Sequence, residues 1–299
     1  MSTVSKSRPA KQPPSELDPF RYGWRYVRIT RPDGTEALEQ VPLTLEDVLH
    51  PELGDFIVQT DGHDNDRAYL KSVFKARLSH NRTAAVLSDC RVDWNVPGIR
   101  PLGPDVAVFF GVRRFIDWAT FDVAAEGARP ILVIEVTSPE TRSNDVGIKV
   151  DYYHRARVPL YVIADVVEET EEERRIELIG YRRTPARYRR IRTDEQGRIW
   201  LEPVRLWLGL TRDELGGYLR LACFDPDTGA ELGDYTAISQ ALAQAQALAE
   251  AQSQARAKAE RGRAKAEARA AAEARARAAA EERIRALEAE LKRSRSRGS

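Results

Sequence analysis

Two apolar runs of the chain each carry one acidic residue at a position where a strand is expected. Glu135 lies inside the run Ile131 to Val136, and Asp105 opens the run Val106 to Phe110. A carboxylate within so apolar a strand costs free energy unless a partner compensates its charge. Two carboxylates on neighbouring strands, with a lysine supplied by the next helix, suit a hard divalent cation and an activated water.

The segment after Glu135 supplies such a lysine. Asp145 and Lys149 are four residues apart, so on a helix they share one face, one turn from each other. As an exposed pair they would contribute only about a few tenths of a kcal/mol, and Asp105 after a proline is also a common turn residue. Each residue alone is ambiguous, whereas their order and spacing together favour a catalytic site.

Asp105, Glu135 and Lys149, together with the run SPETRSND-VGIK-VDYY, resemble the Uma2 family of the PD-(D/E)XK nuclease superfamily. The resemblance implies a restriction-endonuclease-like α/β fold built on a mixed α+β sheet, with its core between about Val58 and Asp165. Thr137 departs from the superfamily pattern, because it stands where the superfamily has lysine. Members of the family are thought to draw this lysine from the following helix, where this chain has Lys149.

The resemblance also implies auxiliary residues. The family tends to have a histidine near the start of the first helix, and His63 fits that position best. Asp89 falls where many members have an acid, and Asp145 is a third candidate. Alternatives stay open: the polar cluster around His63 would be an N-cap cluster in which Asp64 or Asp66 stabilises the first helical turn, and Asp89 would be a solvent-facing strand residue.

Hydrophobic periodicity predicts the elements that position these residues. Residues 131–136 and 159–166 are short apolar strands, separated by a helix that Thr141 would cap and that ends near Arg155. Strand, helix and strand in this order predict an α/β unit with a parallel pair of strands. Further strands are expected at residues 22–29, 36–41, 84–94, 175–181, 188–192 and 199–208, a last hairpin at 218–234, and helices at 44–49 and through residues 70–78.

Composition divides the chain into four parts. Residues 1–19 are rich in Ser, Lys and Pro and are expected to be disordered. Residues 20–235 form the nuclease-like domain. Residues 236–292 consist mainly of Ala, Arg, Glu, Gln and Lys without proline, which predicts one long helix and a weakly specified coiled coil. Residues 293–299 are expected to be a basic, frayed end.

Charge is distributed unevenly along the chain. From residue 237 onward there are 14 Lys/Arg and 8 Asp/Glu, which leaves 33 basic and 38 acidic residues before it. The long helix is therefore a candidate for contact with nucleic acid, and its apolar ends make it a candidate for homodimerisation. A second basic group, Arg187, Arg189 and Arg190, would contact a phosphate backbone or form a solvated hairpin face.

Several classes of protein are disfavoured. No run has the length and apolarity of a membrane span and no signal-peptide core follows Met1, so we expect a cytoplasmic protein without a membrane partner. Cys90 and Cys223 lie far apart, outside metal-ligand spacing, and are expected to be reduced and structural. The four histidines form no HxxxH-like pair, which argues against a zinc site.

Two classes of function remain. The first is an endonuclease dependent on Mg²⁺ or Mn²⁺ that cleaves nucleic acid, with DNA favoured. In it Asp105 and Glu135 bind the metal with a strand carbonyl near Val136, and Lys149 positions a water or stabilises developing charge. Superfamily behaviour would leave a 5′-phosphate and a 3′-hydroxyl. The second is a catalytically silent protein whose nuclease-like fold presents a helical rod for oligomerisation or nucleic-acid binding. The intact Asp, Glu and Lys favour the first.

Overall fold

A computed structural model describes residues 18–138, 141–170, 173–212, 218–233 and 235–296. The chain divides into two compact units, Met1–Asp234 and Tyr235–Ser299. The disorder expected for residues 1–19 falls mostly on residues 1–17, which lie outside the described residues. The frayed end expected at 293–299 is described only for residues 293–296, and these continue the last helix.

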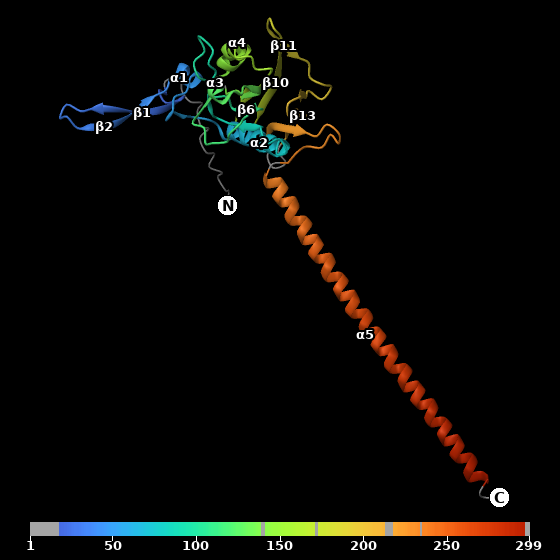
Figure 1. Cartoon of the computed structure of the whole chain (residues 1–299). Helices are drawn as coiled ribbons and strands as arrows, with labels where there is room; N and C mark the ends of the chain where they lie inside the picture. The colour runs from blue at the N-terminus through green and yellow to red at the C-terminus, as the bar shows by residue number, and fades with distance from the viewer. Residues whose placement is uncertain (1–17, 139–140, 171–172, 213–217, 234, 297–299) are drawn as a thin grey trace, which may run out of the picture. The chain divides into compact units, whose positions relative to one another are not determined.

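A six-stranded mixed sheet lies at the centre of the first unit, in the order β11-β10-β9-β8-β6-β4 (Figure 1). Strands β8 and β9 are parallel, and the other neighbours in this sheet are antiparallel. The expected α/β class with a mixed sheet is therefore confirmed. The strands are β4 (Ala85–Leu87), β6 (Val106–Phe109), β8 (Pro130–Val136), β9 (Leu160–Glu169), β10 (Arg174–Arg183) and β11 (Tyr188–Ile191).

The central strands are mainly apolar because both faces of this sheet are buried. Successive strand residues point to opposite faces, so Leu132 and Ile134 enter one hydrophobic core and Val133 enters the other. On the neighbouring strand Val162 and Ile163 divide in the same way. A polar residue on either face therefore lies in the interior.

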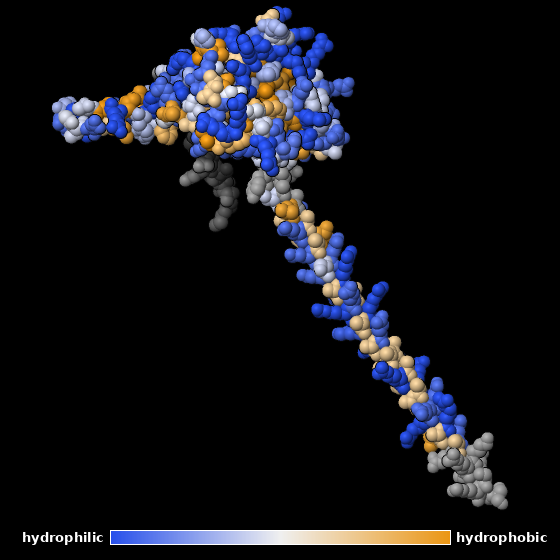
Figure 2. Space-filling model, in the orientation of Figure 1, coloured by the Kyte–Doolittle hydropathy of each residue, from blue (hydrophilic) through white to orange (hydrophobic). Residues whose placement is uncertain are grey.

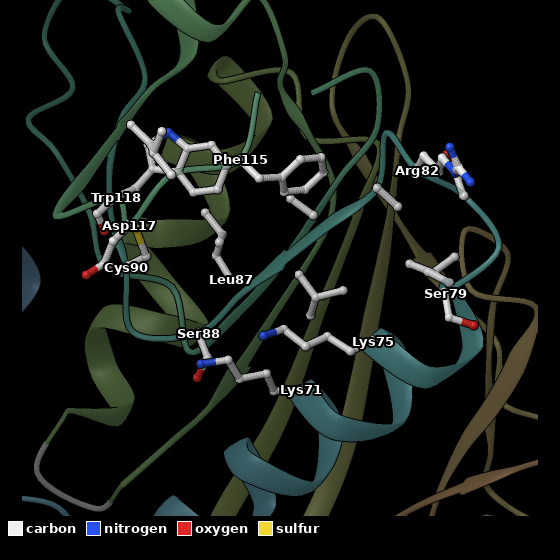
Figure 3. Close-up of a pocket in the computed structure, with 16 residues that line it drawn as sticks. Lys71, Lys75, Ser79, Arg82, Leu87, Ser88, Cys90, Phe115, Asp117 and Trp118 are labelled. Carbon is white, nitrogen blue, oxygen red and sulfur yellow. Dashed lines mark hydrogen bonds between the residues drawn. The ribbon is translucent and has the colours of Figure 1, made fainter. Parts of the chain in front are cut away.

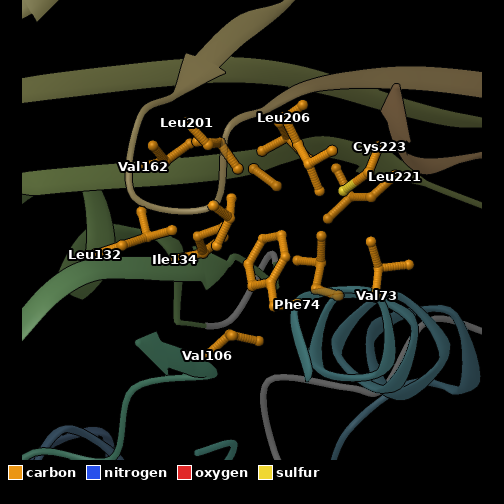
Figure 4. Close-up of a cluster of buried hydrophobic side chains, with 14 of the residues drawn as sticks. Val73, Phe74, Val106, Leu132, Ile134, Val162, Leu201, Leu206, Leu221 and Cys223 are labelled. Atoms are coloured by element: carbon orange, nitrogen blue, oxygen red, sulfur yellow. The ribbon is translucent and has the colours of Figure 1, made fainter. Parts of the chain in front are cut away.

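The first core packs the sheet against helix α2 (Asp61–Arg77) and a three-stranded sheet. Figure 4 shows Phe74 of α2 beside Ile134, and Val73 of the same helix near Leu221 and Cys223 from the three-stranded sheet. The strands of the second sheet are β12 (Ile199–Leu201), β13 (Leu206–Arg212) and β14 (Leu219–Phe224).

The second core covers the opposite face with the segment that follows β8. This segment contains a π-helical turn, η1 (Asn144–Ile148), and helix α4 (Lys149–Arg155). The large buried side chains Trp94, Phe121 and Tyr153 fill this core.

Residues 84–94, expected to form one strand, form two strands in different sheets. Strand β4 ends at Leu87, and β5 (Arg91–Asp93) pairs in parallel with β7 (Thr120–Asp122), which leads into α3 (Val123–Glu126). Asp89 lies between them with φ at +53°, a left-handed conformation that interrupts extended backbone.

Two helix starts also differ from expectation. Thr60 caps α2, because its side chain accepts a hydrogen bond from the His63 N–H. Asp64 lies in the first turn, as one alternative expected, whereas Asp66 lies beyond it. The helix expected to be capped by Thr141 has no such cap: the Thr141 N–H itself donates to Ser138 Oγ, and the π-helical turn follows. π-Helical turns are often found at functional sites.

The N-terminal hairpin and the short helix form where expected. They comprise β1 (Gly23–Thr30), β2 (Glu36–Pro42), α1 (Leu45–Leu49) and a short pairing strand, β3 (Phe56–Ile57). Thr44 and Asp47 complete a capping box at α1, since each side chain bonds the backbone N–H of the other residue.

The second unit is one helix, α5 (Tyr235–Ser296), of 62 residues. The long helix is therefore confirmed. The described side chains of residues 242–289 are all exposed, and the large apolar ones among them, Leu242, Leu248, Ile284 and Leu287, lie towards the two ends of the helix. Figure 2 shows hydrophilic and weakly hydrophobic residues mixed along the helix. Among the described helices, none combines the length and apolarity needed to cross a membrane.

Candidate active site

The register of the central sheet places Asp105 beside Glu135. Strands β6 and β8 are antiparallel with Val106 opposite Ile134, so the next position along brings the two acids opposite each other. The Asp105 N–H donates to Glu135 Oε2 at 3.4 Å, and the Val136 N–H donates to Asp105 Oδ2 at 2.7 Å. Both acids are buried.

The helical segment after β8 directs three further side chains at Glu135. Asp145, Lys149 and Tyr153 follow one another at four-residue spacing and lie on one face. Lys149 Nζ is 2.7 Å from Asp145 Oδ1 and 3.1 Å from Glu135 Oε1. The Tyr153 hydroxyl donates to the same Glu135 oxygen at 2.5 Å. Tyr153 was not predicted as a site residue, although its spacing from Lys149 was a readable signal.

The π-helical turn is held in place from the sheet. The Tyr161 hydroxyl, on β9, donates at 2.9 Å to the backbone carbonyl of Asp145. This bond pairs a backbone acceptor in the irregular turn and fixes the turn that carries the Asp145 and Lys149 side chains.

The surroundings of Lys149 favour its charged form. Burial lowers the pKa of the Lys149 ammonium, but the carboxylates of Asp145 and Glu135 outweigh that effect and raise the pKa above its ordinary value. This favours the ammonium form of Lys149 in the metal-free chain. It can donate hydrogen bonds and stabilise negative charge.

The pKa values of the two central acids are shifted in opposite directions. Burial raises the pKa of Glu135 to about 8, against the opposing charge of Lys149. Burial also raises the pKa of Asp105, but His63 and Lys149 outweigh it and lower that pKa to about 2. The pKa of Asp145 is raised, again chiefly by burial. The cluster thus holds three carboxyl groups against two cationic side chains.

His63 reaches the same cluster from α2, on the other side of the sheet. Its Nε2 is 3.3 Å from Asp105 Oδ2. Burial lowers the pKa of His63, but the Asp105 carboxylate and the Val136 backbone have the opposite and larger effect. The net result is a pKa above the ordinary value for histidine. His63 therefore contacts Asp105 and the Val136 backbone, two of the groups that the sequence suggested as metal ligands. Its Nδ1 is buried without a hydrogen-bond partner among the described residues.

The donors of this cluster fit a hard cation held in an open site. Among the described residues, no three His, Cys, Asp or Glu side chains are arranged as a metal cage. Asp105, Glu135 and the Val136 carbonyl are oxygen donors on adjacent strands, and Mg²⁺ commonly takes one or two carboxylates and completes its shell with water and substrate phosphate. The chemistry of the donor set matches that arrangement.

Thr137, where the superfamily has lysine, belongs to a structural network. Its hydroxyl donates to Asp165 Oδ1 at 3.2 Å and accepts from the Val166 N–H at 2.8 Å. Arg142 binds both oxygens of Asp165, at 2.6 and 2.7 Å. This position ties β8 to β9, so a lysine here would disrupt the network, and Lys149 reaches Glu135 instead.

Four predicted residues lie outside the cluster. Asp89 is mostly exposed and pairs with Arg67 at 3.0 Å. Arg187, Arg189 and Arg190 are exposed on or beside β11, at the edge of the sheet farthest from β4 and three strands from β8. The structure brings together Asp105, Glu135, Asp145, Lys149 and His63, and not these four.

Comparisons with known proteins place the chain in a family. No curated protein matches its sequence. A crystal structure of a putative nuclease belonging to DUF820 from Anabaena variabilis is similar at 16% identity and a TM-score of 0.38, covering 55% of this chain and 92% of that chain. The Uma2 family model, described as "Putative restriction endonuclease", matches residues 52–213, more than half of the chain. The chain therefore belongs to the Uma2 family.

Proposed function

We propose that the protein is a divalent-metal-dependent endonuclease that hydrolyses phosphodiester bonds of nucleic acid, with DNA as the favoured substrate. The observation that carries the proposal is the buried convergence of Asp105 and Glu135 on adjacent strands, with Lys149 at 3.1 Å from Glu135. Family membership supports a nuclease of this class. Asp105, Glu135 and the Val136 carbonyl would hold Mg²⁺ or Mn²⁺, which when bound polarises the scissile phosphate and acidifies a water.

Lys149 acts as an electrostatic group in this proposal. Its Nζ forms ion pairs with Asp145 and Glu135. An ammonium has three N–H donors, so Lys149 can also orient the attacking water or bind the oxygen on which negative charge develops.

Asp145 and Tyr153 position the catalytic groups. Asp145 holds the Lys149 ammonium, and Tyr153 fixes one oxygen of Glu135. His63 holds the Asp105 carboxylate from the opposite face of the sheet. Each of the two central acids therefore has one cationic partner, which keeps their orientation fixed before substrate arrives.

The test is incubation of the full chain with plasmid, single-stranded DNA and RNA in Mg²⁺, in Mn²⁺ and in chelator. We expect cleavage that requires metal and that Asp105→Asn and Glu135→Gln abolish. Asp151→Asn is the matched control, because Asp151 lies on α4 with its side chain 66% exposed and pairs only with Arg155 among the described residues. Wild-type turnover by either site variant would overturn the metal-site assignment.

One observation favours a second function. The described side chains of residues 242–289 on α5 are all exposed, so this surface is free to contact a partner. A catalytically silent protein that presents this helix would cleave none of the three substrates under any metal condition while remaining folded.

A further inference from the structure

A pocket of about 480 Å³ lies at the edge of the central sheet that is nearest to the proposed active site. Its walls are α2, the edge strand β4 and residues 115–118 (Figure 3). Strand β4 pairs with β6, the strand that Asp105 precedes, and it has no second neighbour in this sheet. The pocket volume falls within the range of roughly 300–1,000 Å³ that is usual for ligand sites.

A ridge of basic residues on α2 connects the pocket to the active site. His63, Arg67, Lys71 and Lys75 follow one another at four-residue spacing along the helix. His63 contacts Asp105, and Lys71 and Lys75 line the pocket. At 1.5 Å per residue the two lysines lie about 12 and 18 Å along the helix from His63.

The charges in the pocket are uncompensated. Arg67 is engaged by Asp64 and Asp89, whereas no carboxylate lies within ion-pair distance of Lys71, Lys75 or the pocket residue Arg82 in the described part of the chain. Three cations therefore face one acid of the lining, Asp117. An excess of positive charge in a concave site favours an anionic ligand.

The use of lysine on the globular unit is selective. Between residues 18 and 234 the sequence contains only three lysines, and every other cation of fixed charge is arginine. One is Lys149 of the active site, and the other two are Lys71 and Lys75 of the pocket. Lysine binds phosphate as a flexible point charge, which suits a strand that moves through a site.

The wall opposite the lysines is apolar and aromatic. Phe115 is 56% exposed and Ile116 is 50% exposed. Trp118 is fixed in place, because its indole N–H donates to Glu126 at 3.1 Å, and its ring packs edge-on against Phe115 at 6.1 Å. In Figure 3 the lysine side chains rise from α2 towards Ser88 and Leu87, with the rings of Phe115 and Trp118 across from them. An exposed aromatic ring beside unpaired cations is the arrangement on which unpaired bases stack.

We propose that this pocket binds an unpaired nucleotide of the strand that is cleaved at the Asp105–Glu135 site. Lys71 and Lys75 contact its phosphates and Phe115 stacks on its base. The identity of the ligand rests on the proposed nuclease function, whereas the binding itself is measured without cleavage. An unpaired nucleotide is favoured over duplex because the base must leave its own stack to meet Phe115.

The first test measures binding of a fluorescent single-stranded oligonucleotide to the full chain in chelator, across a salt series. Lys71→Gln/Lys75→Gln is compared with Arg28→Gln/Arg31→Gln, which removes the same charge from two exposed positions of the N-terminal hairpin. The logarithm of the association constant falls as the logarithm of the salt concentration rises. Loss of two phosphate contacts makes this slope shallower by about 1.4. We expect this change in the lysine variant and not in the hairpin variant. Equal slopes in both variants would overturn the proposal.

The second test separates base stacking from charge. Phe115→Ala should weaken binding of the single strand by about 5- to 150-fold, the range expected for one stacked base. Binding of a blunt duplex should change less. Tyr26→Ala is the control, since Tyr26 is 53% exposed on the hairpin. A loss of equal size for duplex and single strand would contradict an unpaired nucleotide.

Lysine footprinting then locates the bound strand within the full chain. An amine-acylating reagent should modify Lys71 and Lys75 in the free protein, and the oligonucleotide should protect them. Lys258 and Lys265 report separately on α5. Protection confined to the α5 lysines would refute the pocket, and protection of Lys71 and Lys75 by an acidic peptide but not by nucleic acid would make it a protein-docking site.

The two proposals fail in different ways. If the wild-type chain cleaves and the lysine variant binds like wild type, the nuclease proposal stands and the pocket proposal is wrong. If the chain cleaves nothing but the lysine variant binds more weakly, the pocket is a nucleic-acid site and the nuclease proposal is wrong.

Discussion

At the scale of single residues, the proposed site is a buried cluster in which each charge depends on its neighbours. Lys149 lies within 3.1 Å of both Asp145 and Glu135, and its side chain is 11% exposed. In such a buried place a cation stabilises the negative charge of a transition state more strongly than a cation in water would.

Lys149→Met is therefore expected to lower kcat by about 10²- to 10³-fold, the effect of removing one preorganised donor. The Mg²⁺ concentration for half-maximal rate should change much less, because the ammonium is not a metal ligand. Initial rates across a Mg²⁺ series measure both quantities, with Asp151→Asn as the control on the same helix. Normal cleavage by Lys149→Met would mean that the lysine of this family does not act from this position.

Glu135 provides a test that needs no substrate. Its pKa is raised by burial to about 8, so the metal-free fold loses stability as the pH rises from the unfolded value of about 4.3 through 8. Glu135→Gln lacks this ionisation and should therefore melt at a higher temperature than wild type in chelator, with a gap that widens between pH 5 and pH 9. Each kcal/mol relieved corresponds to about 2–4 °C in Tm.

Thermal melts of both proteins in chelator at several pH values check this. Mg²⁺ should narrow the gap by stabilising wild type only, since the amide is a poor ligand for the ion. A gap that shrinks as the pH rises would show that Glu135 is not under electrostatic strain in the metal-free chain.

At the scale of elements, α2 carries both His63 and the basic ridge, so its placement matters to both proposals. A buried ion pair fixes it: Arg174 Nη1 is 2.6 Å from Asp66 Oδ2, with both side chains at most 3% exposed. The other Asp66 oxygen accepts from the Leu221 N–H at 2.8 Å, and Glu169 lies 3.2 Å from Arg174 Nε. The pair therefore joins α2 to β10 and β14.

Asp66→Ala should destabilise the chain by about 3–5 kcal/mol, because it leaves Arg174 buried with one carboxylate instead of two. Asp66→Leu/Arg174→Met should recover part of that loss, since an apolar pair of similar volume leaves no buried charge on Arg174. The recovery is incomplete because the Leu221 N–H loses Asp66 and Glu169 loses Arg174. Urea unfolding of the two variants and wild type measures the difference. If the single and double variants were equally unstable, apolar packing rather than the ion pair would hold α2.

At the scale of the whole chain, α5 has little burial of its own. Its 62 residues would extend about 93 Å at 1.5 Å each, and they include 13 Lys/Arg and 8 Asp/Glu, a charge of +5. Such a helix is stabilised by propensity and partners rather than by packing.

A chain that ends at Asp234 should therefore keep metal-dependent cleavage, bind nucleic acid more weakly at low salt, and lose any homodimer that depends on α5. Sedimentation of the full and truncated chains, with binding across a salt series, measures both effects. An unchanged oligomeric state together with an unchanged salt slope would leave α5 with neither role.

What the sequence by itself determined was local. An acid inside an apolar run, a helix-compatible spacing of Asp145 and Lys149, and a proline-free Ala-rich segment each follow from period and composition. They predicted an α/β unit and the long helix, whereas the restriction-endonuclease-like fold class came from the resemblance to the Uma2 family. The strand–helix–strand order likewise predicted the parallel pair β8 and β9.

Tertiary structure decided which polar groups meet. Asp105 and Glu135 are 30 residues apart, and Asp66 and Arg174 are 108 apart, so their contacts depend on strand register and helix placement. In the packed chain Asp89 lies outside the site, because the chain turns between β4 and β5. Tyr153 lies inside the site, where its hydroxyl contacts Glu135. Periodicity specifies which face of an element is buried, but hydrogen-bond geometry and desolvation act between elements. Those energies arise only when the elements pack together. For this reason the partners of the polar side chains are seen in the structure but cannot be predicted from the hydrophobic pattern of the sequence.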